Sequence, residues 1–101
     1  MKLLTEQIKN ALPKLGATES TAMGERDIVC KFFDPCGSWT WYVIEGEETE
    51  DGDWQFFGLV DGFHKEYGYF TLSELESVRG PLGLGIERDI HFPAKKVHQY
   101  N

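Results

Sequence analysis

The chain lacks most of the features that indicate a secreted, membrane-embedded or disulfide-stabilised protein. Its two cysteines, Cys30 and Cys36, are too few to cross-link a small secreted scaffold of 101 residues. No apolar run is long enough to span a bilayer, and the first residues turn polar after Leu4, before a signal-peptide core could form. We therefore expect a cytoplasmic protein that keeps its thiols reduced and enters no membrane.

Motifs for nucleotide, thiol and serine chemistry are also missing. Gly83 and Gly85 form a G-x-G, but no third glycine follows and no G-K-[ST] occurs. These glycines also precede an expected strand, whereas phosphate loops precede a helix whose N-terminus supplies amide donors. The cysteines lack C-x-x-C spacing, and no serine lies in a G-x-S-x-G elbow. The sequence therefore predicts no cofactor.

Basic residues are few and scattered, whereas acidic residues are concentrated. Ten Lys and Arg stand against seventeen Asp and Glu, for a formal net charge of −7. Six of the acids lie within residues 45–53, and the other eleven nearly balance the ten bases. A field of this sign repels phosphate, so we expect no direct nucleic-acid binding, while acidic mimicry of nucleic acid stays open. We interpret the acidic run as a flexible, solubilising hairpin loop.

Aromatic residues are plentiful, with three Trp, four Tyr and seven Phe, and such residues favour strands. Periodicity and turn residues predict a helix over 5–12, strands over 28–33, 38–45, 54–61 and 67–72, a helix over 73–79 and a possible strand over 86–92. Short connections make consecutive strands antiparallel neighbours. The prediction is one α+β domain over 1–101: an antiparallel sheet of four or five strands, an N-terminal helix packed on it and a short second helix.

Local signals refine these elements. Thr5 is the expected N-cap of the first helix, and Ser73 with Glu76 forms an S-x-x-E capping box for the second. Within 38–45, alternation divides the side chains between two faces, with Trp39, Trp41 and Val43 on one and Thr40, Tyr42 and Ile44 on the other.

Two regions are candidates for a protein-binding surface. One is the acidic run, which would attract a basic partner. The other is an aromatic face of the sheet, because a single helix covers only one face well, although coverage of both faces stays open. The candidate residues are Glu47, Glu48, Glu50 and Asp51 of the acidic run, and Trp39, Trp41 and Trp54 of the strands.

The stretch RGPLGLGIERDIHF, residues 79–92, allows two interpretations. If 86–92 is extended, Glu87, Asp89 and His91 share one face, and two carboxylates with an imidazole would suit a hard metal or proton transfer. His64 and Glu66 could join them from the loop over 62–66, and His98 from the C-terminal segment. Such alternation is also typical of a half-buried edge strand, and the spacing matches no specific metal motif.

The structural interpretation assigns this stretch to a turn that returns the chain to the sheet. Its turn residues are Gly80, Pro81, Gly83 and Gly85. Its apolar anchors are Leu82, Leu84, Ile86, Ile90 and Phe92. We expect Arg88 to clamp a backbone carbonyl or a carboxylate.

The order of the motifs LLTEQ and FGLVDGFHKEYGYFTLSELESVRGPLGLGIERDIHF resembles a small bacterial family catalogued as domain of unknown function twenty-nine fifty-eight. The likeness covers nearly the whole chain and is strongest over 67–92, where the blocks G-Y-x-x-L-x-E-L, R-G-P-x-G-L and E-R-D-x-H-F stand in the family's order. The acidic run is not part of that pattern. The resemblance implies a short, stand-alone protein often encoded on plasmids, phages or integrated elements, and it implies no activity.

We therefore predict a non-enzymatic, small acidic binding protein. The resemblance implies an accessory or anti-defence factor of a mobile element that acts by occupying a partner protein. The alternative is a small metal-dependent enzyme built on Glu87, Asp89 and His91. The sequence leaves the oligomeric state open.

Overall fold

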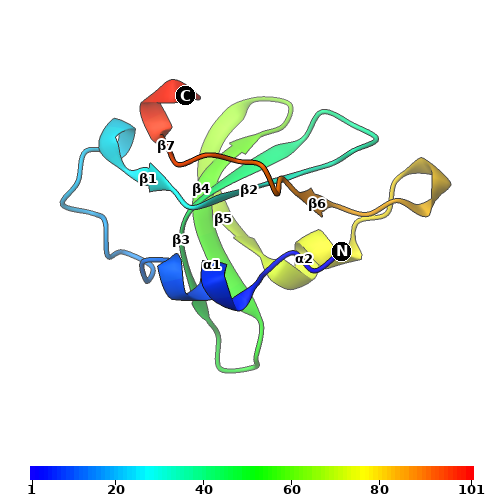
Figure 1. The fold of residues 1–101 in the computed structure, drawn as a ribbon, viewed down its shortest axis with the longest axis horizontal. Helices are drawn as coiled ribbons and strands as arrows, with labels where there is room; N and C mark the ends of the chain where they lie inside the picture. The colour runs from blue at the N-terminus through cyan, green and yellow to red at the C-terminus, as the bar shows by residue number, and fades with distance from the viewer.

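An antiparallel sheet of five strands lies at the centre of the computed structural model, which describes all residues 1–101 (Figure 1). The strands stand in the order β5-β4-β3-β2-β6. They are β2 (Cys30–Phe33), β3 (Thr40–Glu48), β4 (Trp54–Asp61), β5 (Lys65–Thr71) and β6 (Glu87–Arg88). A separate two-stranded sheet pairs β1 (Asp27–Ile28) with β7 (Lys95–Lys96). With two α-helices beside these sheets, the predicted α+β fold is confirmed.

The helices are short. They are α1 (Glu6–Ala11) and α2 (Leu72–Ser77). The chain also contains three 3-10 turns, η1 (Met23–Glu25), η2 (Pro81–Gly83) and η3 (Val97–Gln99). Thr5 caps α1 as predicted, since its hydroxyl oxygen accepts a hydrogen bond from the Ile8 amide at 3.2 Å. Pro13 follows the end of the helix at Leu12, the C-cap.

The cap of α2 lies two residues earlier than predicted. Thr71, not Ser73, is the N-cap, and its hydroxyl oxygen accepts from the Glu74 amide at 3.1 Å. Ser73 instead binds Asp53, with its amide 3.1 Å and its hydroxyl 2.6 Å from the two carboxylate oxygens. β5 therefore passes directly into α2.

Strand β3 is longer than predicted and takes up half of the acidic run. β4 has the predicted bounds, but β3 continues to Glu48 and pairs Glu45 with Phe57 and Glu48 with Trp54. The connecting turn shrinks to residues 49–53. The prediction of one flexible acidic loop over 45–53 is therefore wrong for its first half, because β4 is long enough to pair with that segment.

The last predicted strand, 86–92, is mostly a turn. Only β6 pairs with β2, with Arg88 opposite Phe32. Beyond it, the Asp89 carboxylate accepts from the His91 amide at 3.0 Å, and the Phe92 amide donates to the Asp89 carbonyl at 3.3 Å. An Asx turn of this kind ends an extended segment.

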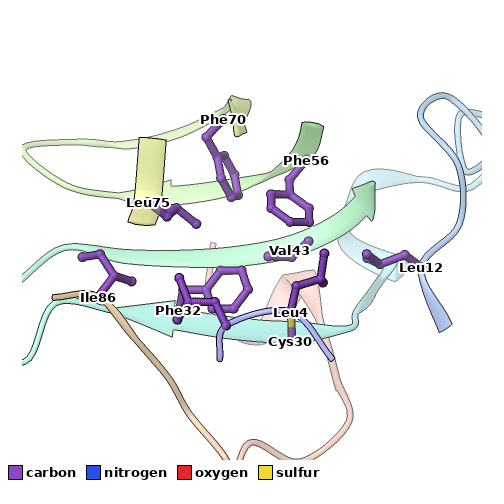
Figure 2. Close-up of a cluster of buried hydrophobic side chains, with 10 residues drawn as sticks. Leu4, Leu12, Cys30, Phe32, Val43, Phe56, Phe70, Leu75 and Ile86 are labelled. Atoms are coloured by element: carbon purple, nitrogen blue, oxygen red, sulfur yellow. The ribbon is translucent and has the colours of Figure 1, made fainter. Parts of the chain in front are cut away.

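Each face of the sheet carries a buried core cluster. The first core cluster, shown in Figure 2, lies under α1, α2 and the N-terminal residues and comprises Leu3, Leu4, Leu12, Cys30, Phe32, Val43, Phe56, Phe70, Leu75 and Ile86. The second, beneath the C-terminal segment, comprises Ile28, Tyr42, Ile44, Leu59 and Val97. The alternation predicted for β3 is confirmed, since Trp41 packs against the first cluster and Tyr42 belongs to the second.

Candidate partner-binding surface

Large apolar side chains stay exposed in two regions of the surface. On the β4–β5 hairpin they are Phe63, Tyr67 and Tyr69. Near β6 they are Met1, Leu82, Leu84 and Ile90. Phe63 is 89% exposed, although burying an aromatic ring in an apolar contact is favourable. The end of the hairpin is therefore a candidate contact surface.

Phe63 forms one wall of a small hollow at this end of the sheet. The hollow is lined by Trp39, Val60, Phe63, His64 and Glu66 and has a volume of about 150 Å³; we call it the aromatic hollow. The ring centroids of Trp39 and Phe63 lie 5.4 Å apart with an interplanar angle of 81°, so the two rings form a corner. Trp41 lies behind Trp39, with ring centroids 6.0 Å apart.

The strand register places these side chains. Trp41, Val60 and Glu66 are cross-strand partners on β3, β4 and β5, so they form a row on the same face of the sheet. Trp39 comes two residues before Trp41, and its ring lies over Gly62. A Cβ atom at Gly62 would come within 2.5 Å of Trp39 ring carbons, so the tryptophan needs a glycine there.

The only acidic side chain that lines the hollow is free of ion pairs. Glu66 is exposed and takes part in none of the three ion pairs of the structure. No Lys or Arg lines the hollow. The neighbouring Lys65 donates a hydrogen bond from Nζ to the Tyr100 carbonyl at 2.8 Å, so its ammonium group lies at the C-terminal segment and not at the hollow.

The opposite end of the sheet carries the acidic run, and four of its six carboxylates accept hydrogen bonds from the chain itself: Glu45, Glu47, Asp51 and Asp53. Glu45 is only 3% exposed and accepts from the Gly16 amide at 2.8 Å, the Thr18 amide at 2.9 Å and the Thr18 hydroxyl. Burial raises the pKa of Glu45, but these hydrogen bonds and Arg26 outweigh burial and hold the pKa below its ordinary value. Glu47 accepts from the Leu15 amide at 2.9 Å.

The sequence-predicted binding residues therefore fall at two ends of the sheet. Trp39 and Trp41 lie together at the aromatic hollow, whereas Trp54 stacks on Phe56 at 6.5 Å with Lys9 above its ring. Of the four acids, Glu47 holds the loop before it and Asp51 accepts from the Thr49 hydroxyl. The other two, Glu48 and Glu50, are exposed.

Sequence reasoning missed Gly62 and Phe63, and it considered Glu66 only as a possible addition to the Glu87 site. The available signal was a phenylalanine in a short polar turn, Asp61-Gly62-Phe63-His64, where an apolar side chain has no sheet face to cover.

Glu87, Asp89 and His91 line one shallow hollow of about 360 Å³ beside Met1. Asp89 lies 3.8 Å from the Lys31 ammonium group. No group of three His, Cys, Asp or Glu side chains in the structure is placed to hold a metal ion. His64 and Glu66 lie at the aromatic hollow instead.

Arg88 has the clamping contact that the sequence predicts. Its Nη1 donates to the Leu3 carbonyl at 3.1 Å and to the Lys2 carbonyl, and so fixes the N-terminal segment beside β6. Of the expected anchors, Ile86 is buried and Phe92 packs on the second core cluster. The anchor role is wrong for the three remaining residues, which are exposed: Leu82, Leu84 and Ile90.

The expected turn does form at Gly80 to Gly85. Pro81 opens η2, and Gly83 takes a φ of +72°, which favours glycine. Leu82 also has a positive φ, of +67°, at the tip of this turn. A Cβ at Gly85 would lie 3.0 Å from the Arg79 guanidinium.

Together, the fold and the hollow define a small α+β protein whose sheet has a core cluster on each face and ends in a half-open aromatic corner. The family described as "Protein of unknown function (DUF2958)" matches residues 3–100, and the chain belongs to that family. The resemblance inferred from the motifs is thereby confirmed. No curated protein and no solved structure matches the chain. None of its helices has the length and apolar character needed to cross a bilayer.

Proposed function

We propose that the protein is a non-enzymatic module that binds a protein partner through the aromatic hollow. The observation that carries the proposal is the exposed ring of Phe63, held against Trp39 beside a carboxylate that is free of ion pairs. Tryptophan and other aromatic side chains supply much of the binding free energy at protein interfaces.

The Trp39 side of the corner supports this function because its ring is held in place before binding. Trp39 is backed by Trp41 on one side and by Gly62 beneath it, so little side-chain entropy remains to be lost on association. A preorganised apolar surface with a polar rim is typical of the centre of an interface.

The acidic end has a secondary role in the proposal. The net charge of −7 and the exposed Glu48 and Glu50 would attract a basic partner. Such attraction speeds encounter more than it deepens affinity, and it weakens with salt over a Debye length of roughly 8 Å. An accessory or anti-defence role in a mobile element, cytoplasmic location and the absence of direct nucleic-acid contact stay predictions.

A pull-down from the source cell compares four versions of the chain. They are the wild type, Phe63→Ala, His91→Ala, and a version with Glu48, Glu50 and Asp51 changed to Ser. Glu47 is left intact because its carboxylate holds Leu15. We expect a partner that is captured by the wild type and by His91→Ala, is lost with Phe63→Ala, and is captured more slowly by the Ser version.

Phe63→Ala is a clean test because the side chain is 89% exposed, and surface changes of this kind alter the stability by about 0.5 kcal/mol or less. Circular dichroism checks that the variant is folded. If the same protein is captured equally by Phe63→Ala, the hollow is not the contact surface. A His91-dependent turnover without any captured partner would favour the metal-dependent enzyme instead.

A further inference from the structure

We propose that the aromatic hollow receives the side chain of an arginine on the partner protein. This inference rests on the proposed binding function and adds the chemistry of the group that is bound.

The size of the hollow selects one side chain rather than a free ligand. Its volume of about 150 Å³ corresponds to roughly five waters at about 30 Å³ each. Pockets that enclose drug-sized molecules are larger, at roughly 300–1,000 Å³. A guanidinium group with its adjoining methylene groups is of suitable size.

The charge of the lining selects a cation. Glu66 is its only carboxylate, no Lys or Arg lines it, and Lys65 is held by the Tyr100 carbonyl. A neutral apolar side chain in the hollow would take water away from Glu66 without supplying a hydrogen bond, which costs free energy. An anion would be repelled by Glu66 and by the net charge of −7.

The rings select a planar cation. The faces of Trp and Phe rings carry negative potential and attract cations, with Trp the strongest. The perpendicular arrangement of Trp39 and Phe63, at 81°, lets a flat group lie along one ring and meet the other. Arginine stacks on aromatic rings and binds a carboxylate through two N–H groups, whereas the lysine ammonium is a strongly hydrated point charge.

The neighbouring strand leaves room for the partner's backbone. β5 is an edge strand of the sheet, so one side of it has no strand partner. Gly68 follows Glu66 on the same face, and a Cβ there would meet no atom within 4 Å. A partner segment can therefore approach beside Glu66 and insert its arginine.

Titration with short peptides tests the inference without the partner. Three acetylated, amidated pentapeptides of glycine carry arginine, lysine or citrulline at the centre, and citrulline is the neutral isostere of arginine. The indole N–H signals in ¹⁵N–¹H spectra report on Trp39, Trp41 and Trp54 separately, and Trp54 serves as an internal control at the other end of the sheet.

We expect the arginine peptide to shift the signals of Trp39 and Trp41 with millimolar affinity and to leave Trp54 unchanged. Glu66→Gln should weaken this affinity about threefold, the scale of an exposed ion pair. The matched control is Glu19→Gln, which removes one exposed charge elsewhere and should leave the affinity unchanged.

Equal shifts with the citrulline or the lysine peptide would overturn the assignment to arginine, and so would an affinity unaffected by Glu66→Gln. This failure is distinguishable from failure of the proposed function. If the pull-down partner still depends on Phe63 while the arginine peptide has no effect, the binding function stands and the arginine does not.

Discussion

The two ends of the same sheet use their polar groups in opposite ways. At the acidic end, Glu45 and Glu47 accept hydrogen bonds from amides of their own chain, and Asp53 binds Ser73. At the aromatic end, Glu66 has no ion pair and Phe63 is almost fully exposed. A high local charge therefore does not identify the surface that is free to bind a partner.

The difference has a physical cause. The segment after α1 forms neither helix nor strand, so its amides need acceptors from elsewhere, and an unpaired buried amide is costly. Glu45 and Glu47 supply those acceptors to Leu15, Gly16 and Thr18. The β4–β5 turn lies at the surface, where water can accept hydrogen bonds from its amides, so it does not need acceptors from Glu66 or His64.

The largest expected effect is at the acidic end. Glu45→Ala removes the acceptor of three hydrogen bonds. Because the donors are partly buried, we expect the free energy of unfolding to fall by about 2–3 kcal/mol, measured by urea denaturation. Glu45→Gln retains one carbonyl oxygen and should lose less. A loss below about 0.5 kcal/mol, the scale of an ordinary surface change, would mean that this acid is not structural.

The next effect concerns the geometry of the aromatic end. Gly62→Ala forces a Cβ against Trp39, so we expect a loss of about 1–3 kcal/mol and a displaced indole with altered fluorescence. Gly68→Ala is the matched control, because its Cβ would meet nothing within 4 Å, and it should leave both stability and emission nearly unchanged. Equal effects of the two substitutions would remove the reason for a glycine under Trp39.

Arg88 lies at neither end and should affect stability alone. Arg88→Ala removes the bonds to the Lys2 and Leu3 carbonyls, which together contribute about 1 kcal/mol. In a domain of this size we expect the melting temperature to fall by roughly 4–8 °C. The affinity for the arginine peptide should stay as in the wild type; an unchanged melting temperature would exclude the clamp as a stabilising contact.

The smallest effect is a dependence on pH. The pKa of Glu45 is lowered in the folded protein, so its contribution to stability is complete above its ordinary pKa of 4.5 and is lost as pH falls through the folded-state value. Stability of the wild type should therefore decrease below about pH 4.5. In Glu45→Gln this part of the decrease should be absent, and identical pH profiles would contradict the assignment.

The fold class and most strands could be predicted because alternation and turn residues are local signals. The bounds of β4 follow from flanking turn residues, Asp53 and Gly62. The sequence does not distinguish the two possible N-caps of α2, because Thr71 with Glu74 and Ser73 with Glu76 form the same S/T-x-x-E pattern. The Ser73 hydroxyl donates its hydrogen bond to Asp53, twenty residues away, and no local signal in the sequence shows this contact.

The roles of the site residues depend on contacts between distant parts of the chain. Glu45 and Glu47 bind amides 27 to 32 residues earlier, so their burial could not be predicted from a run of acids. Trp39 and Trp41 were identified from their aromatic character. The placement of Trp39 beside Glu66 in the hollow requires the register of three strands, which alternation alone does not fix.

Site-specific photo-crosslinking compares the two ends most directly. The photoreactive residue p-benzoylphenylalanine replaces Phe63 at the aromatic end in one version and Glu50 at the acidic end in another, and both positions are exposed. Irradiation in the source cell should give one discrete crosslinked protein from position 63 and little or none from position 50. A discrete product from position 50 alone would contradict the account, because it would place the partner on the acidic end of the sheet.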